Sequence, residues 1–132
     1  MTYLHVLKFG GTSLASAERI ERVGQIVTRA SEDARVAVVV SAMGRVTSDL
    51  IDASALASRG DEAYRALIDR VIALHEGPLA SLVSEQDRER VQAAYQGWSE
   101  ELANRLHGIA LVRECSPRTL DAVMAFGELA SS

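Results

Sequence analysis

Apolar residues first occur in two short runs separated by a segment with a helical period. Residues 4–9 carry Leu4, Val6, Leu7 and Phe9, and residues 36–40 form a β-branched run without alternation. The second pattern is typical of a strand covered on both faces in a parallel sheet. Between them, residues 16–30 repeat apolar positions every three or four residues, which predicts an amphipathic helix capped by Ser16. The order predicts a βαβ unit with a right-handed crossover.

The rest of the chain shows helical periodicity interrupted by turn residues. We predict helices at residues 48–58, at 62–76 with a stop at Gly77-Pro78, at 84–107 with an end near Gly108, and from Ser116-Pro117 onward. The second and third of these look like an antiparallel hairpin. Because their apolar stripes contain no paired polar groups, we expect this hairpin to be a lid or a subunit surface rather than a source of catalytic residues.

These elements predict an α/β fold, a three-layer αβα arrangement of a mostly parallel sheet with helices on both faces. Residues 1–132 would form one portion of one domain, with no second domain. The last five residues continue a helical pattern without a stop signal, so we expect a truncated fold. An incomplete sheet leaves an open edge, and we therefore expect a homo-oligomer.

Composition narrows the classes of function. The 132 residues carry a net charge of -4, and their 14 basic residues are interleaved with 18 acidic ones, which argues against nucleic acid as a partner. The longest apolar run, residues 36–40, is too short to cross a bilayer, and the first residues do not resemble a leader. We expect no membrane association and a cytoplasmic location. The single cysteine, Cys115, excludes an internal disulfide, and we assign no metal ligands.

Candidate chemistry begins where the first predicted strand ends. Gly10 and Gly11 allow close backbone approach, Thr12 and Ser13 offer hydroxyl and N–H groups, and a helix follows, so the segment is typical of a phosphate site. Lys8 would supply the counter-charge. The lysine precedes the glycines, unlike in a P-loop. The alternative is a plain glycine turn with a lysine that extends to solvent.

Two further places carry candidate chemistry. The predicted second strand ends in a small-residue loop that contains Ser41 and Thr47, and parallel strands bring such loops to one edge of the sheet. Near the chain end, Glu128 follows Met124 by four residues, which predicts a carboxylate near the packed face of the last helix. The alternatives are a turn with a helix cap for Ser41 and Thr47, and a solvated glutamate for Glu128.

Together these segments resemble a known family. Lys-Phe-Gly-Gly-Thr-Ser at residues 8–13 resembles the opening signature of aspartokinases, in the amino acid kinase superfamily. Ser41-Ala42 with Thr47 six residues after the serine, and Gly127-Glu128 with a serine three residues after the glutamate, are similar to later family motifs. The resemblance covers essentially the whole chain in order and implies an amino acid kinase-like fold.

The resemblance also implies roles for individual residues. Lys8 would be catalytic, contacting the ATP phosphates and stabilising the transferring phosphoryl group, and Gly10, Gly11, Thr12 and Ser13 would line the phosphate path. Ser41, Thr47 and Glu128 would hold L-aspartate, with Glu128 near its ammonium group. ATP and Mg²⁺ would be the cofactors.

The implied activity is aspartate kinase, which makes 4-phospho-L-aspartate in the first step of lysine, threonine and methionine biosynthesis. The family's adenine and ribose contacts lie beyond residue 132, so the isolated chain is expected to be inactive. Two alternatives stay open: a superfamily kinase for glutamate, acetylglutamate or a nucleoside monophosphate, and a non-catalytic module that assembles through the hairpin. A parent fused to homoserine dehydrogenase or to diaminopimelate decarboxylase is also left open.

Overall fold

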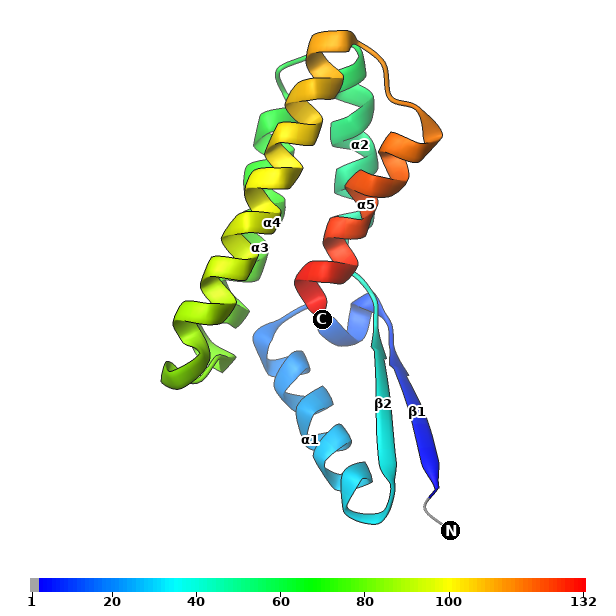
Figure 1. The fold of residues 1–132 in the computed structure, drawn as a ribbon, viewed down its shortest axis with the longest axis vertical. Helices are drawn as coiled ribbons and strands as arrows, with labels where there is room; N and C mark the ends of the chain where they lie inside the picture. Colours follow the sequence, from blue (N-terminus) through cyan, green and yellow to red (C-terminus); the bar gives the residue numbers. More distant parts are fainter. Residues whose placement is uncertain (1–2) are drawn as a thin grey trace.

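The computed structural model describes residues 3–132 and shows a βαβ unit joined end-on to a group of helices (Figure 1). Its elements in order are β1 (Leu4–Phe9), the short 3-10 helix η1 (Gly11–Leu14), α1 (Ala17–Asp33), β2 (Arg35–Val40), α2 (Val46–Ser58), α3 (Tyr64–Leu82), α4 (Glu85–Val112) and α5 (Pro117–Ser131). The α/β class predicted from the sequence is confirmed, with an incomplete sheet.

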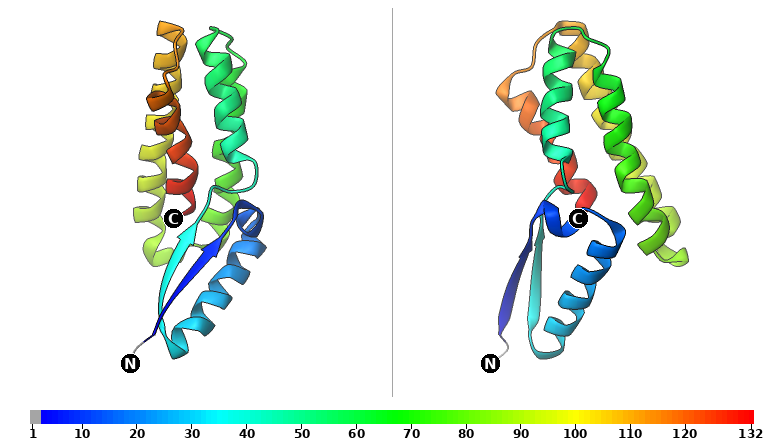
Figure 2. Two further views of the ribbon diagram at one scale, coloured as in Figure 1. Left: turned by 90° about the vertical axis from the view of Figure 1, so that its right-hand side faces the viewer. Right: turned by 180° about the vertical axis from the view of Figure 1, so that it is seen from behind.

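The βαβ unit forms as its sequence pattern predicts. Strands β1 and β2 pair in parallel, with Leu4 opposite Arg35 and Phe9 opposite Val40. The Ser16 hydroxyl accepts a hydrogen bond from the Arg19 N–H at 3.3 Å, which confirms the predicted N-cap of α1. Because α1 returns the chain along one face of the strands, both strands end at the same edge, next to the helices (Figure 2).

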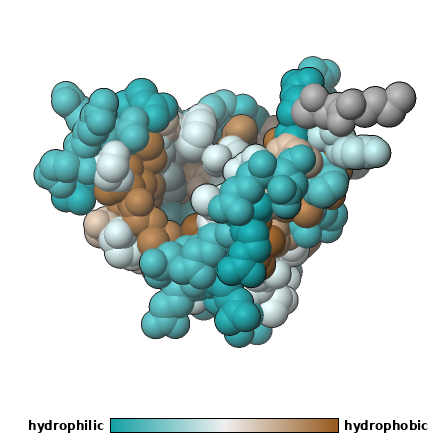
Figure 3. Space-filling model, turned by 90° about the horizontal axis from the view of Figure 1, so that it is seen from below, coloured by the Kyte–Doolittle hydropathy of each residue, from teal (hydrophilic) through white to brown (hydrophobic). Residues whose placement is uncertain are grey.

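Coverage of the sheet differs from the prediction. Val38 and Val39 are 44% and 47% exposed, although we expected β2 to be buried on both faces. Successive side chains of a strand point to opposite faces, so Val39 lies on the face that no helix covers, and Val38 lies on the face of α1, which α1 covers only in part. Helices α2 to α5 stack beyond the carboxyl ends of the strands (Figure 1). When the molecule is seen from below, apolar surface gathers on the left, the side on which α3 and α4 lie in Figure 1 (Figure 3).

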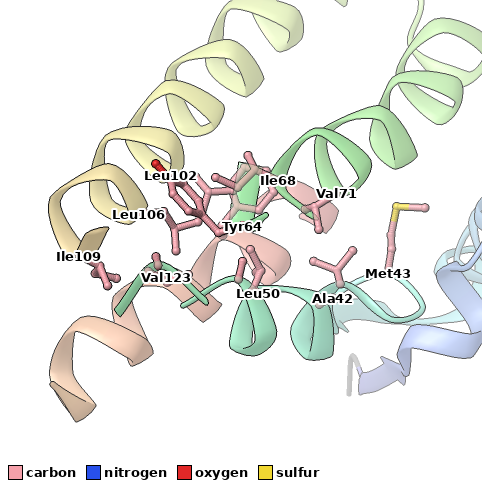
Figure 4. Close-up of a cluster of buried hydrophobic side chains, with 14 of the residues drawn as sticks. Ala42, Met43, Leu50, Tyr64, Ile68, Val71, Leu102, Leu106, Ile109 and Val123 are labelled. Carbon is pink, nitrogen blue, oxygen red and sulfur yellow. The ribbon is translucent and has the colours of Figure 1, made fainter. Parts of the chain in front are cut away.

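The hydrophobic core lies among helices α2 to α5. Its most buried side chains come from all of these helices and include Val46, Leu50, Tyr64, Val71, Leu102, Leu106 and Val123 (Figure 4). The antiparallel hairpin of α3 and α4 is present as predicted. Its inner side packs into the core, where Tyr64 of α3 and Leu106 of α4 are almost completely buried. The role of the hairpin as a lid or a subunit surface stays a prediction.

Two predicted helix ends are also wrong. Pro78 lies inside α3, and α4 continues past Gly108 to Val112, where Arg113 adopts φ 55°. An interior proline costs about 3 kcal/mol, and burial of a large aliphatic side chain returns about 1.5–3 kcal/mol. Beyond the predicted stops, Leu79 packs against the core and Ile109 is 2% exposed. Tertiary packing therefore extends both helices through residues that locally disfavour a helix.

Candidate functional site

The three segments with candidate chemistry meet at the carboxyl ends of the strands. The Ser41 N–H donates to the Phe9 carbonyl at 3.1 Å, and the Gly44 N–H donates to the Gly11 carbonyl at 3.0 Å. These bonds hold the first loop (residues 10–16) against the second loop (residues 41–47). The C-terminal end of α5 lies beside them in each view (Figures 1 and 2). The predicted convergence of the two loops is therefore present in the structure.

The two adjacent glycines of the first loop have different roles. A Cβ added to Gly11 would lie 2.6 Å from the Ala42 carbonyl oxygen, so Gly11 allows the two loops to touch. A Cβ added to Gly10 would meet nothing within 4 Å, and Gly10 has an ordinary φ of -79°. Neither packing nor backbone conformation explains the glycine at residue 10. The space beside Gly10 is open to a ligand that approaches the backbone.

A third glycine brings α5 to the same point. A Cβ added to Gly127 would lie 2.6 Å from the Ala42 Cβ and 3.1 Å from Val46 Cγ1. Ala42 is therefore enclosed by Gly11 on one side and by Gly127 on the other, and it is 4% exposed. The absence of side chains at these two positions lets three distant segments meet around one alanine.

Lys8 lies on the open face of the sheet, next to its carboxyl edge. Side chains alternate along a strand, so Lys8 shares a face with Leu4 and Val6, which are 61% and 65% exposed. The Lys8 side chain is also exposed, and among residues 3–132 no salt bridge involves it. The sequence also distinguishes this residue, because Lys8 is its only lysine and the other positively charged residues are arginines.

A short helix lies between the glycine turn and α1. Helix η1 begins at Gly11 and ends at Leu14, and α1 then begins after Ser16, as predicted. Thr12 and Ser13 are exposed within η1, and the Ser13 N–H donates to the Gly10 carbonyl at 2.9 Å. Arg19, which sequence reasoning missed, donates from Nη1 to the Thr12 carbonyl at 2.6 Å. This contact places a guanidinium beside the first loop.

The second loop leaves Ser41 and Thr47 half-buried at its two ends. Helix α2 begins at Val46, two residues earlier than predicted, and its N-cap residue, Arg45, makes no side-chain cap hydrogen bond. Thr47 therefore lies inside the first turn and does not cap the helix. The alternative interpretation of Thr47 as a helix cap is wrong.

Glu128 is exposed, in contrast to its predicted place near the packed face of α5. The reason is that Val123, Phe126 and Gly127 form the buried side of α5, and Gly127 itself occupies the contact with the second loop. Glu128 is the next residue after that contact, and its side chain is accessible to solvent.

Sequence reasoning missed an ion pair next to the second loop. Asp49 of α2 accepts hydrogen bonds from Arg70 of α3, from Nη2 to Oδ1 at 2.7 Å and from Nε to Oδ2 at 3.2 Å. A signal was available, because Asp49 follows Val46 by three residues and precedes Leu50 on the buried side of α2. Its partner, Arg70, lies 21 residues away, and no pattern in the neighbouring sequence predicts that the two residues pair.

Metal and membrane features are absent from the part of the chain that the structure describes. Residues 3–132 contain no group of three or more His, Cys, Asp or Glu side chains that could hold a metal ion. Their helices include none with the length and apolar character of a membrane span.

Two titratable groups away from the loops are packing residues. His75 is 2% exposed, and burial lowers its pKa, while its Nδ1 lies 2.8 Å from the Val71 carbonyl oxygen. Burial also raises the pKa of Cys115, which is a free thiol. Neither group lies among the residues that meet at the loops.

The chain is similar in sequence to known proteins. The model of the amino acid kinase family matches residues 4–132. Aspartokinase 1, chloroplastic, from Arabidopsis thaliana is 33% identical over 133 aligned positions, which cover 96% of this chain and 22% of that protein.

Solved structures show the same likeness. The crystal structure of E. coli aspartokinase III in complex with lysine and aspartate (T-state) matches with a TM-score of 0.78 at 25% identity, covering 97% of this chain and 26% of that one. The complex of that enzyme with aspartate and ADP (R-state) matches with a TM-score of 0.77 at 28% identity, again covering 97% and 26%. The chain thus spans about a quarter of the length of these proteins.

Proposed function

Because the chain belongs to the amino acid kinase family, we propose that it is the N-terminal portion of a catalytic domain that transfers a phosphoryl group from ATP to the side-chain carboxylate of L-aspartate. The observation that supports this most is the meeting of the two loops and α5 around Ala42. The segments that meet there carry both the candidate nucleotide residues and the candidate amino acid residues, which supports the proposal. Because similar proteins are named aspartokinases, we propose aspartate as the acceptor in preference to other compounds.

The first loop and Lys8 would bind the phosphates of ATP. Phosphoryl transfer depends on positioned cations and backbone dipoles that stabilise charge on the transferring group. Lys8 supplies an exposed ammonium group with no salt-bridge partner among the described residues. The space beside Gly10 lets phosphate oxygens approach the backbone N–H groups of the first loop, and the Thr12 and Ser13 hydroxyls add donors.

The second loop and α5 would hold L-aspartate. Ser41 and Thr47 offer hydroxyl groups at the two ends of the loop, and the exposed Glu128 carboxylate is free to bind the substrate ammonium group. The attacking group is the substrate's own side-chain carboxylate, which is ionised at neutral pH and needs no general base. The product would be 4-phospho-L-aspartate, the first intermediate on the route to lysine, threonine and methionine.

Mg²⁺ would enter with the nucleotide. It keeps several water ligands and binds through substrate phosphates more often than through a cage of protein groups. Residues 3–132 offer no cluster of carboxylates for it, so we assign no Mg²⁺ ligand to this part of the chain and derive no step through the ion.

We further propose that the full-length protein is cytoplasmic and homo-oligomeric. The exposed valines of β2 and the open sheet face are surfaces that remaining segments or a second copy would cover. The isolated 132-residue chain would not phosphorylate aspartate, because the adenine and ribose contacts would come from later residues.

The test is a substrate panel on the full-length protein. ADP release should depend on L-aspartate and should not be supported by glutamate, acetylglutamate or a nucleoside monophosphate. Lys8→Ala should lower kcat on the order of a hundredfold or more, because it removes a charge that stabilises the transition state. Arg29→Ala, which removes an exposed charge from α1, is the matched control and should leave kcat unchanged. Turnover of another acceptor in preference to aspartate, or full activity of Lys8→Ala, would contradict the proposal.

A further inference from the structure

The ion pair between Asp49 and Arg70 is asymmetric in its exposure. The Asp49 side chain is 10% exposed, whereas that of Arg70 is 61% exposed. Two hydrogen bonds, at 2.7 Å and 3.2 Å, make the contact bidentate. Such charge-assisted pairs constrain orientation as well as distance. The guanidinium therefore fixes a nearly buried carboxylate from the outer side of α3.

Asp49 lies where the second loop becomes α2. It is two residues beyond Thr47, and its N–H donates to the Arg45 carbonyl at 3.0 Å. Since the first turn of α2 has no side-chain cap hydrogen bond, a capping side chain does not hold it in place. Val46 and Leu50, which flank Asp49 on the buried side of α2, are completely buried.

We propose that the Asp49–Arg70 pair is a positioning device that fixes the Thr47 end of the second loop and thereby sets the affinity for the amino acid substrate. This inference rests on the proposed function, in which the loop binds L-aspartate. Asp49 and Arg70 act through the loop and do not touch the substrate.

Each end of the second loop has its own anchor. Around Ala42, the loop is held by the close approach of Gly11 and Gly127. At the Thr47 end, the ion pair connects the loop to α3. A ligand that binds Ser41 and Thr47 together needs a constant separation between the two hydroxyl groups, because a small misplacement of a binding group is enough to weaken binding.

The exposure difference predicts unequal effects for the two partners. Removing Arg70 leaves a nearly buried carboxylate without its partner, which strongly favours rearrangement of the first turn of α2. Removing the charge of Asp49 leaves Arg70 unpaired but already largely in solvent. The Asp49 variant should therefore disturb the loop less than the Arg70 variant. The double variant should be no worse than the Arg70 variant alone, because both remove the same contact.

The experiment compares Arg70→Gln, Asp49→Asn and the double variant in the full-length protein. Arg70→Gln should raise KM for L-aspartate about tenfold, with KM for ATP and kcat within about twofold of the parent. Arg70→Lys should restore part of the loss, since it keeps the charge but not the bidentate geometry. The control is Arg65→Gln, which removes an exposed pair between Arg65 of α3 and Glu62 in the turn before that helix and should change neither KM.

A second readout does not depend on activity. Amide hydrogen exchange of residues 41–48 should become faster in Arg70→Gln, with no change in the middle of α4. A variant that unfolds more easily but keeps its KM for L-aspartate and the exchange rates of this loop would overturn the inference. If the parent protein does not phosphorylate aspartate, the proposed function fails. The amide exchange rate of residues 41–48 then decides whether the ion pair anchors the loop: faster exchange in Arg70→Gln supports the anchoring, and unchanged exchange overturns it.

Discussion

The βαβ unit and the helical group α2 to α5 differ in where their apolar residues lie. In the helical group, Val46, Leu50, Leu106 and Val123 are completely buried. In the βαβ unit, α1 has no fully buried residue and the strands are largely exposed. The candidate nucleotide residues belong to the first region, and those for the amino acid are held by the second. The helical group is therefore the stable platform, and the βαβ unit brings Lys8 and its loop to it.

The largest expected effect comes from truncating one apolar side chain in each of the two regions. Leu106→Ala should lower the free energy of unfolding by about 2–5 kcal/mol, because it empties part of a closed core. Val38→Ala should cost less than about 1 kcal/mol, since that side chain is already 44% exposed. Urea unfolding of both variants measures the difference. Equal costs would break the comparison and would mean that Val38 is covered in solution.

The junction between the regions can be tested with two helix glycines. Gly127→Ala should destabilise by about 1–3 kcal/mol, because its Cβ would lie 2.6 Å from the Ala42 Cβ. Gly97→Ala in α4 is the control: its Cβ meets nothing within 4 Å, so the better helix propensity of alanine should stabilise by about 1 kcal/mol. The comparison is measured by the same unfolding assay, and a stabilising Gly127→Ala would show that α5 is not pressed against the second loop.

A smaller effect concerns pH and is confined to the helical group. Burial lowers the pKa of His75 below its ordinary value, so the folded state favours the neutral ring. The unfolded chain then binds more protons than the folded one below about pH 6.5, and the stability from His75 is lost as pH falls from there towards the lowered pKa. The slope is at most about 1.4 kcal/mol per pH unit.

His75→Gln removes this titration and should flatten the pH dependence of unfolding in that window. The ring lies between Tyr95 and Phe126, with centroids 5.7 Å and 5.8 Å away, so the variant should also be less stable at neutral pH. Denaturation midpoints from pH 5 to 8 separate the two effects. An unchanged pH slope would assign the acid sensitivity to other groups.

Local chemistry made several features predictable. Ser16, Ser84 and Ser116 each accept a hydrogen bond from the backbone N–H three residues on, and each cap could be recognised from residue type and spacing. The parallel pairing of β1 and β2 followed from a strand–helix–strand order. The meeting of the two loops followed in turn, because parallel strands end at the same edge.

Other features depended on residues far apart in the sequence. Pro78 and Gly108 are locally unfavourable in helices, and only the packing of Leu79 and Ile109 keeps them there. The different roles of Gly10 and Gly11 appear only once Ala42 lies beside one of them. The Asp49–Arg70 pair joins residues from two helices, and no pattern along the chain pairs them.

The sequence by itself determined the order and kind of the elements and their caps, and it indicated which residues are candidates for binding phosphate and an amino acid, because these features depend on neighbours within about one helical turn. The tertiary structure alone decided where helices end, which strand face stays open and which side chains face solvent. Those outcomes depend on burial and close contact between distant segments, and such free energies exceed local preferences only after the chain has folded.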